Sequence, residues 1–137
     1  MKKKITLALL AQIFVLATYA YDFTTGGVYY NVTSAASQST PGKVSVVSGD
    51  GYSGTVTIPA SVENGGMTYD VTAIANGAFK NCLRLRAINI GSNVKTIGYQ
   101  AFLGCEDLEE VVIPDGNITQ ACAVLEDIAT HAGELAA

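Results

Sequence analysis

The densest group of potentially reactive side chains in this 137-residue chain is acidic. It consists of Glu106, Asp107, Glu109 and Glu110. Carboxylates can act as general acid and base when they converge in a cleft that shifts their pKa values. The sequence shows no convergent polar cluster around this group, so a structural explanation has to be weighed against a catalytic one.

Cysteine and histidine could also do chemistry, but both are scarce. The cysteines are Cys82, Cys105 and Cys122, an odd count that leaves at least one thiol unpaired and argues against a disulfide framework. A structural zinc site needs four ligands, and the only histidine, His131, is expected to be a solvated helix residue. The chain has no G-x-S-x-G nucleophile motif. We therefore predict no catalytic residue, no metal site and no cofactor.

An internal repeat supplies the elements that would position these residues. Residues 71–93 and 94–116 align without a gap at a spacing of 23 residues. The matched positions are apolar or cysteine in both units, which chance does not explain. They pair Val71 with Val94, Ile74 with Ile97, Ala78–Phe79 with Ala101–Phe102, Cys82 with Cys105, Leu85 with Leu108, Ile88 with Val111, and Ile90 with Ile113.

Each repeat contains an L-x-x-L-x-L strand pattern, which in the first unit is Leu85-x-x-Ile88-x-Ile90. Ile88 and Ile90 lie two residues apart, so they face one side of the strand and Asn89 faces the other. The Ala-Phe-x-x-Cys segment turns the chain and places Phe79 inside. One coil cannot bury its own apolar face, but stacked coils can. The predicted fold is a short leucine-rich-repeat solenoid, with a β-strand plus a turn or short helix in each coil.

Stacking would also explain the acidic group. Arg84 aligns with Asp107 and Arg86 aligns with Glu109, so each pair should lie side by side on adjacent coils. Opposite charges on neighbouring strands stabilise the pairing and oppose a wrong register. We therefore interpret the acidic group as half of a charge ladder between coils.

The aligned cysteines can be assessed in the same way. Stacking places Cys82 and Cys105 about 5 Å apart, which is within the range for a disulfide. Equivalent side chains point in parallel, however, and this suits the disulfide torsion poorly. Buried free thiols are the favoured interpretation.

The two repeats resemble BspA-type leucine-rich repeats. AIANGAFKNCLRLRAINI and TIGYQAFLGCEDLEEVVIP are similar to the family pattern I-G-x-x-A-F-x-x-C-x-x-L-x-x-I-x-I-P, with departures at Ala75 and Gly91. The upstream stretch YDFTTGGVYYNVTS resembles the lead-in of such proteins from Bacteroides-type bacteria. The resemblance implies surface attachment, host-protein binding or adhesion between bacteria.

Residues 1–20 have the features of a secretory signal peptide. Lys2–Lys4 precede an apolar run of 13 residues, and Ala20 stands at the expected cleavage point. That run is shorter than the about 20 residues needed to span a bilayer, so no stable membrane span is expected after cleavage. Cleavage would leave five basic and twelve acidic residues, a net charge of −7, which disfavours nucleic acid as a partner. We therefore expect an exported protein that is secreted, held at the cell surface or periplasmic.

The period changes on both sides of the repeats. Alternating apolar residues and turn sequences over residues 21–54 predict an antiparallel β cap, and residues 55–70 resemble a partial first coil. The spacing of apolar residues over 117–137 predicts an amphipathic helix that begins near Thr119, ends near Gly133 and closes the last coil. A frayed or truncated chain end is the alternative.

These features favour an exported, non-enzymatic binding module. Its partner would be a protein, a surface glycan or a second copy of the chain. The alternatives are a structural spacer or self-assembling subunit, and a glycan-binding accessory protein. The candidate binding face consists of the outward strand positions and one variable position: Thr55, Thr57, Ala87, Asn89, Glu110, Val112 and Tyr99.

Reversing one charge of the predicted ladder tests the register of the coils. Arg86→Glu would place two carboxylates side by side, so we expect a modest fall in the thermal unfolding temperature in low salt. The fall should shrink in high salt because ions screen exposed charges. Unchanged thermal stability in low salt would contradict the pairing.

Overall fold

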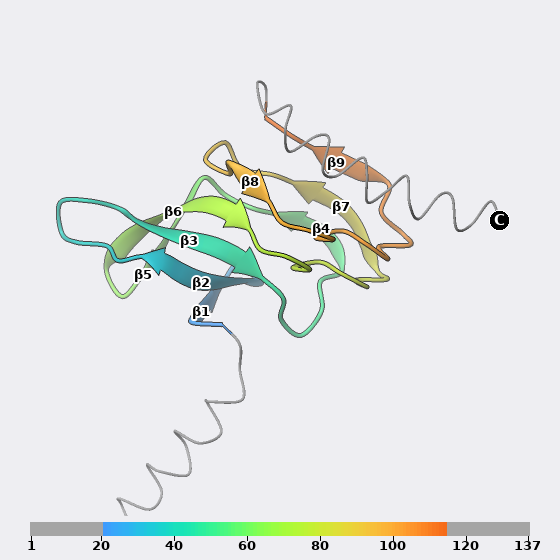
Figure 1. Cartoon of the computed structure of the whole chain (residues 1–137), viewed down its shortest axis with the longest axis horizontal. Helices are drawn as coiled ribbons and strands as arrows, with labels where there is room; N and C mark the ends of the chain where they lie inside the picture. Colours follow the sequence, from blue (N-terminus) through green and yellow to red (C-terminus); the bar gives the residue numbers. More distant parts are fainter. Residues whose placement is uncertain (1–20, 115–137) are drawn as a thin grey trace, which may run out of the picture.

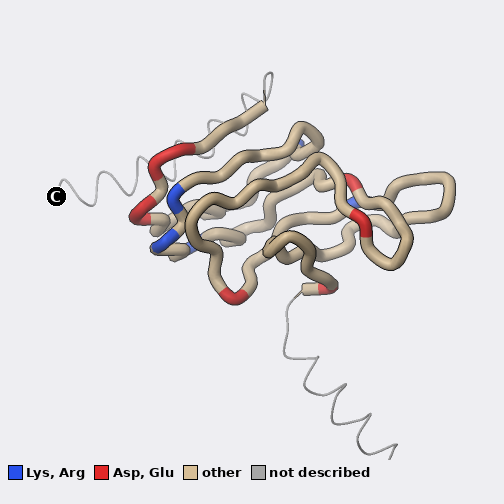
Figure 2. The backbone as a smooth tube through the Cα atoms, turned by 180° about the vertical axis from the view of Figure 1, so that it is seen from behind, with Lys and Arg blue, Asp and Glu red and all other residues tan. Residues whose placement is uncertain are grey.

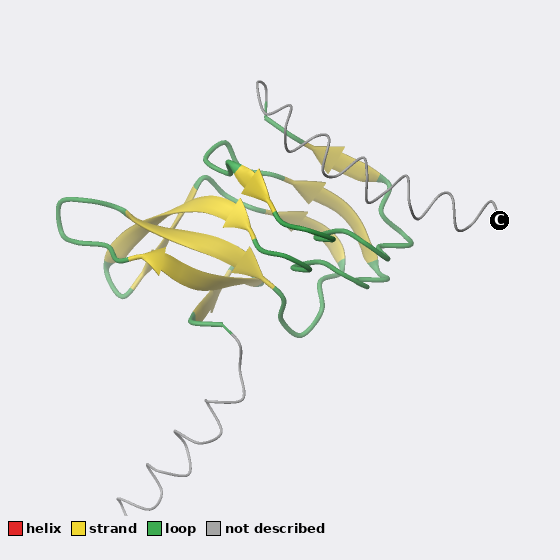
Figure 3. Cartoon of the chain, in the orientation of Figure 1, coloured by secondary structure: helices red, strands yellow, loops and turns green. Residues whose placement is uncertain are grey.

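The computed structural model of the chain describes residues 21–114, which form two β-sheets joined by turns and contain no helix (Figure 1, Figure 3). The predicted signal peptide, the predicted C-terminal helix, Cys122 and His131 lie outside these residues. Among the residues described, no helix is long and apolar enough to cross a membrane.

The larger sheet, sheet A, has six strands and changes from antiparallel to parallel pairing at β3. β1, β2 and β3 pair antiparallel, β3 pairs in parallel with β6, and β6 pairs in parallel with β8. The first half of β6 forms a hairpin with β5 through Gly65 and Gly66, whose positive φ angles suit a two-residue turn. The strands are β1 (Phe23–Thr25), β2 (Val28–Ser34), β3 (Gly42–Val47), β5 (Ser61–Asn64), β6 (Met67–Ile74) and β8 (Thr96–Ile97).

The smaller sheet, sheet B, is parallel and has the order β4-β7-β9. Ala87 pairs with Glu110 and Ile88 pairs with Val111. This is the 23-residue register that the sequence predicts, and it is confirmed. The strands are β4 (Gly54–Thr57), β7 (Leu85–Asn89) and β9 (Glu110–Val112).

The two sheets are the two sides of three stacked coils (Figure 1). The first coil consists of β3 and β4, the second of the end of β6 and β7, and the third of β8 and β9. β3 belongs to the first coil because Val44 pairs with Val71 and Val46 pairs with Ile74.

This arrangement corrects the predicted boundary between an N-terminal cap at 21–54 and a partial coil at 55–70. β1 and β2 do pair antiparallel with β3, but β3 is also the first strand of the solenoid. The repeat alignment missed it because the first coil has another length. Val56 follows Val46 by ten positions, whereas their partners Ile74 and Ile88 are fourteen positions apart.

Three neighbouring aromatic rings, one tilted and two stacked in parallel, form the centre of the core. The ring centroids of Tyr52 and Phe79 are 4.5 Å apart, and those of Phe79 and Phe102 are 5.1 Å apart with the ring planes 3° from parallel. All three side chains are buried, which confirms the inward position predicted for Phe79 and Phe102. Tyr52 takes the same place in the first coil, so one aromatic side chain from each coil contributes to the stack.

The turn of each repeat contains two left-handed residues and no helix. They are Gly77 and Asn81 in the second coil and the aligned Gln100 and Gly104 in the third, with φ angles between 54° and 78°. A left-handed residue at every fourth position cannot be part of a right-handed helical turn. The short helix that the sequence allowed in each coil is therefore replaced by a turn.

Two buried tyrosines differ in how their hydroxyl groups are satisfied. The Tyr52 hydroxyl donates to the Val47 carbonyl oxygen at 2.6 Å and accepts from the Tyr29 backbone N–H at 3.1 Å. The Tyr30 hydroxyl has no hydrogen-bond partner among the described residues. Burial raises the pKa of Tyr30 to about 12 and also raises the pKa of Tyr52.

Removal of each hydroxyl should therefore have a different effect. We expect Tyr52→Phe to lower the free energy of unfolding by about 1–3 kcal/mol, because the buried Val47 carbonyl and the partly buried Tyr29 N–H lose their partner. Tyr30→Phe should leave the stability unchanged or raise it, because an unpartnered buried hydroxyl is removed. Urea unfolding of both variants measures this, and an equal loss in the two would refute the assignment.

Candidate functional site

The outward side of sheet B carries six of the seven residues predicted for the binding face. The strand register sets them in two rows that cross all three strands. Thr55, Thr57, Glu110 and Val112 are exposed, while Ala87 and Asn89 in the central strand are partly covered. The rows are Thr55–Ala87–Glu110 and Thr57–Asn89–Val112.

Polar contacts between the strands hold this face in place. The Asn89 side-chain amide donates to the Thr57 hydroxyl at 3.2 Å. Arg86 donates to a Glu109 carboxylate oxygen at 2.9 Å, which confirms that ion pair, and the same contact raises the pKa of Arg86. A shallow hollow of about 580 Å³ lies beside this pair and is lined by Gly54, Thr55, Arg86, Ala87, Glu109 and Glu110.

The other predicted ion pair, between Arg84 and Asp107, is wrong. Arg86–Glu109 is the ion pair found within residues 21–114, and Arg84 makes none with Asp107. Arg84 and Asp107 lie in the turn segments before the strands, where ladder pairing does not hold the side chains together. In Figure 2 the acidic residues of the third coil lie beside the basic residues of the second.

Tyr99 does not belong to the face formed by the other six residues. It is exposed, as predicted, with 74% of its surface accessible. It lies in the turn after β8, which pairs in sheet A, and its backbone N–H donates to the Asn76 side-chain oxygen at 2.7 Å. The sequence alignment predicts the position of Tyr99 within the repeat, but it does not show that the preceding strand, β8, belongs to sheet A.

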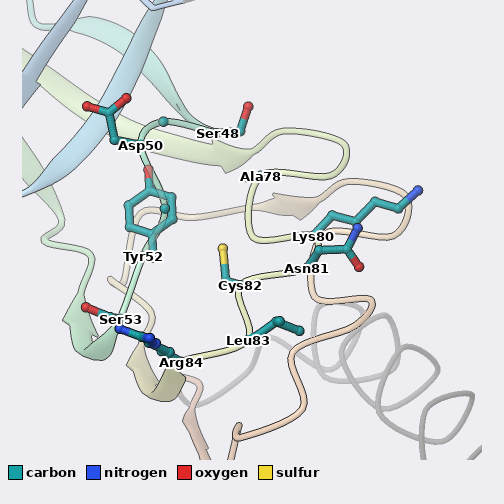
Figure 4. Close-up of a pocket in the computed structure, with 12 residues that line it drawn as sticks. Ser48, Asp50, Tyr52, Ser53, Ala78, Lys80, Asn81, Cys82, Leu83 and Arg84 are labelled. Atoms are coloured by element: carbon teal, nitrogen blue, oxygen red, sulfur yellow. The ribbon is translucent and has the colours of Figure 1, made fainter.

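A notch that sequence reasoning missed lies between the first two coils (Figure 4). Its volume is about 450 Å³. One wall is the β3–β4 connection, residues 48–53, and the other is the turn at residues 78–84. The notch lies where the β3–β4 connection of the first coil is too short to pack along the whole turn of the second coil. The only sequence feature that predicts the notch is the difference in length between the β3–β4 and β6–β7 connections. This difference can be recognised only after β3 is known to pair with β6.

The charges around the notch come from both walls. Figure 4 shows Asp50 and Lys80 on opposite sides, Arg84 beside Ser53, and the Cys82 thiol directed into the space. Lys80 also donates to the Gln100 side-chain oxygen at 3.0 Å. Within the described part of the chain, no group of three or more His, Cys, Asp or Glu side chains is arranged to hold a metal ion.

The two aligned cysteines occupy different environments. The two thiols are not joined in a disulfide. Cys105 is buried as predicted, and its thiol donates to the Phe79 carbonyl oxygen at 3.0 Å. Cys82 is only partly buried because the shorter first coil leaves its side open to the notch.

Parallel strands at a 23-residue spacing, with one aromatic residue per coil in the core, define a leucine-rich-repeat solenoid. The sequence model described as "BspA type Leucine rich repeat region (6 copies)" matches residues 55–123, half of the chain. The chain belongs to the BspA-type leucine-rich-repeat family, as its repeats suggested.

Solved structures of bacterial proteins share this fold. A leucine-rich repeat protein from Bacteroides ovatus is 32% identical, with a TM-score of 0.55 over 69% of this chain and 24% of its own. A leucine rich cell surface protein from Faecalibacterium prausnitzii is 28% identical, with a TM-score of 0.53 over the same two shares. A leucine-rich repeat protein from Bacteroides capillosus, 24% identical, has a TM-score of 0.56 over 66% of this chain and 63% of its own.

The matched part of the chain spans 24% of the length of the Bacteroides ovatus and Faecalibacterium prausnitzii proteins. Comparison with curated proteins gave no match. The family and the fold are therefore defined, while partners have to be inferred from the surface.

Thiol labelling tests the geometry of the notch. We expect iodoacetamide to alkylate Cys82 several-fold faster than Cys105 in the native protein, because accessibility limits the reaction of a thiol. Mass spectrometry of the digested chain measures the two sites separately. Equal rates in the native protein would mean that the notch is closed, and equal rates after unfolding in urea serve as the control.

Proposed function

We propose that the protein is an exported, non-enzymatic binding module that recognises a protein at a host or bacterial cell surface. Sheet B is the binding surface. The observation that supports this most is the pair of rows of outward side chains, which are held in register across three strands. Rigid strands present side chains at fixed positions, and this lowers the entropy lost on binding.

The composition of the face fits a protein partner. Hydroxyl, amide and carboxylate groups lie beside the exposed Val112, and the Arg86–Glu109 pair borders the shallow hollow. Such a mixture allows hydrogen bonding around a small apolar contact, as at ordinary protein interfaces. Three strands offer a small area, so we expect weak binding that multivalent display would strengthen.

Export is supported by the signal peptide features of residues 1–20 and by the similarity to a leucine rich cell surface protein of Faecalibacterium prausnitzii. The segments proposed along the chain are a signal peptide, an N-terminal β cap, the repeats and a C-terminal helix. In this proposal β1 and β2 cover the β3 edge of the first coil, where pairing with β2 is present.

Self-assembly is the second candidate function, and the edge of sheet B favours it. Among the described residues β4 pairs only with β7, so its other edge is unpaired. An open edge can add a strand from a second copy. A light-scattering series over protein concentration separates a monomeric binder from a self-assembling subunit.

Charge substitutions on the two sheets test the binding face. The labelled chain is screened against an array of purified extracellular proteins, and hits are compared between two double variants. Thr57→Arg with Val112→Arg alters sheet B, whereas Val32→Arg with Thr33→Arg alters the same residue types at exposed positions on β2 of sheet A. We expect the sheet B variant to bind at least about tenfold more weakly and the control to bind normally.

Equal losses in the two variants would refute sheet B as the binding surface. Absence of any hit, together with concentration-dependent growth in light scattering, would instead support self-assembly.

A further inference from the structure

One wall of the notch between the first and second coils carries backbone carbonyl groups that accept no hydrogen bond from the described residues. In the turns of the second and third coils, the N–H groups of Gly77, Phe79 and Asn81 donate across the stack. Their acceptors are the carbonyl oxygens of Tyr99, Ala101 and Leu103, at 2.8–3.0 Å. The carbonyl groups of these three third-coil residues therefore point toward the preceding coil, and the N–H groups of their three partners point toward the following one.

The aligned carbonyl groups one coil earlier should have the same direction, but no described N–H group of the first coil donates to them. Ala78 and Lys80 are the counterparts of Ala101 and Leu103, and the two turns share four internal hydrogen bonds at aligned positions. Their carbonyl groups should therefore point toward residues 48–53, yet no hydrogen bond joins that segment to the turn at 76–83 in the described residues. Both residues line the notch, so this wall presents backbone acceptors to which no described backbone N–H donates.

Both ends of the notch are closed. The Ala75 N–H donates to Val46 and the Gly54 N–H donates to Arg84, each at 2.8 Å. An extended peptide would need a straight strand edge and room to continue at both ends. The notch offers a curved turn and a short gap, which suit a compact ring whose donors point in several directions.

The side chains indicate the charge of the occupant. The Arg84 guanidinium has no ion pair or hydrogen bond in the described part of the chain, although eight acidic residues lie in that part. Ser53 lies beside it on the facing wall, and Asn81 lines the same wall as Arg84, so polar side chains from both walls surround the space (Figure 4). A guanidinium is well suited to bind a carboxylate.

We propose that this notch is a second binding site, separate from sheet B, and that it binds one acidic sugar unit. The hydroxyl groups of the ring donate to the Ala78 and Lys80 carbonyl oxygens. Arg84 binds the sugar carboxylate, and Asp50, Ser53 and Asn81 select among ring orientations. The volume of about 450 Å³ is within the range of small-ligand sites.

Titration of the full chain with digalacturonate tests the proposal, and galactobiose serves as the neutral control. Two readouts are used: the amide NMR signals of the notch, and protection of Cys82 from iodoacetamide with Cys105 as the internal reference. We expect digalacturonate at up to ~10 mM to shift the signals of Gly49, Gly51 and Cys82 and to slow alkylation of Cys82. Galactobiose should bind more weakly, because it lacks the carboxylate.

Two exposed arginines provide matched variants. Arg84→Ala should weaken digalacturonate binding by about tenfold or more, whereas Arg86→Ala, which alters the charge pair on sheet B, should leave it unchanged. Both positions are exposed, so both variants should fold, and unchanged chemical shifts outside the substituted region verify this.

The following outcomes would overturn the proposal. They are the absence of shifts in the notch with either sugar, equal binding of both sugars, and equal effects of the two arginine variants. Shifts confined to sheet B would also overturn it and would instead place sugar binding on the face proposed for proteins. Failure of the notch leaves the array experiment on sheet B unaffected, so the two proposals fail independently.

Discussion

The structure depends on the fact that no single coil can bury its own interior. Each coil contributes one aromatic side chain, and Tyr52, Phe79 and Phe102 become a continuous core only when the coils stack. The parallel pairing of both sheets and the hydrogen bonds between the turns all follow from this stacking. A residue on the surface of one coil is therefore placed relative to its neighbours by the register of the stack.

A difference in length between coils then produces a site. The second and third coils match residue for residue, so their turns bond along their whole length. The first coil has the same two strands but a shorter connection, and the bonding is interrupted there. The result is a polar notch with carbonyl acceptors on one wall, while the outward side of sheet B is unaffected. The chain thus has two surfaces of different chemistry. One is the regular outward side of sheet B, and the other is the notch that results from the shorter connection in the first coil.

Sequence reasoning succeeded where a feature repeats and failed where it does not. The inward position of Phe79, the strand register and the Arg86–Glu109 pair followed from the 23-residue alignment. Arg84 failed to pair with Asp107 although the same alignment predicted it, because their segments are turns in which side chains are not held opposite one another. Six of the seven face residues lie together on sheet B, whereas Tyr99 follows a strand of sheet A.

The sequence by itself determined the period of the coils, the residues that point inward and the family. These are properties of spacing, and a 23-residue pattern of apolar positions specifies them locally. The tertiary structure alone decided that β3 completes the first coil and that Cys82 is open while Cys105 is buried. It also decided that Arg84, which makes no ion pair with the described residues, lies beside a notch. These features depend on which distant strands pair and on how two connections of unequal length lie against each other. The sequence of a single repeat unit specifies neither this strand pairing nor the packing of the two connections.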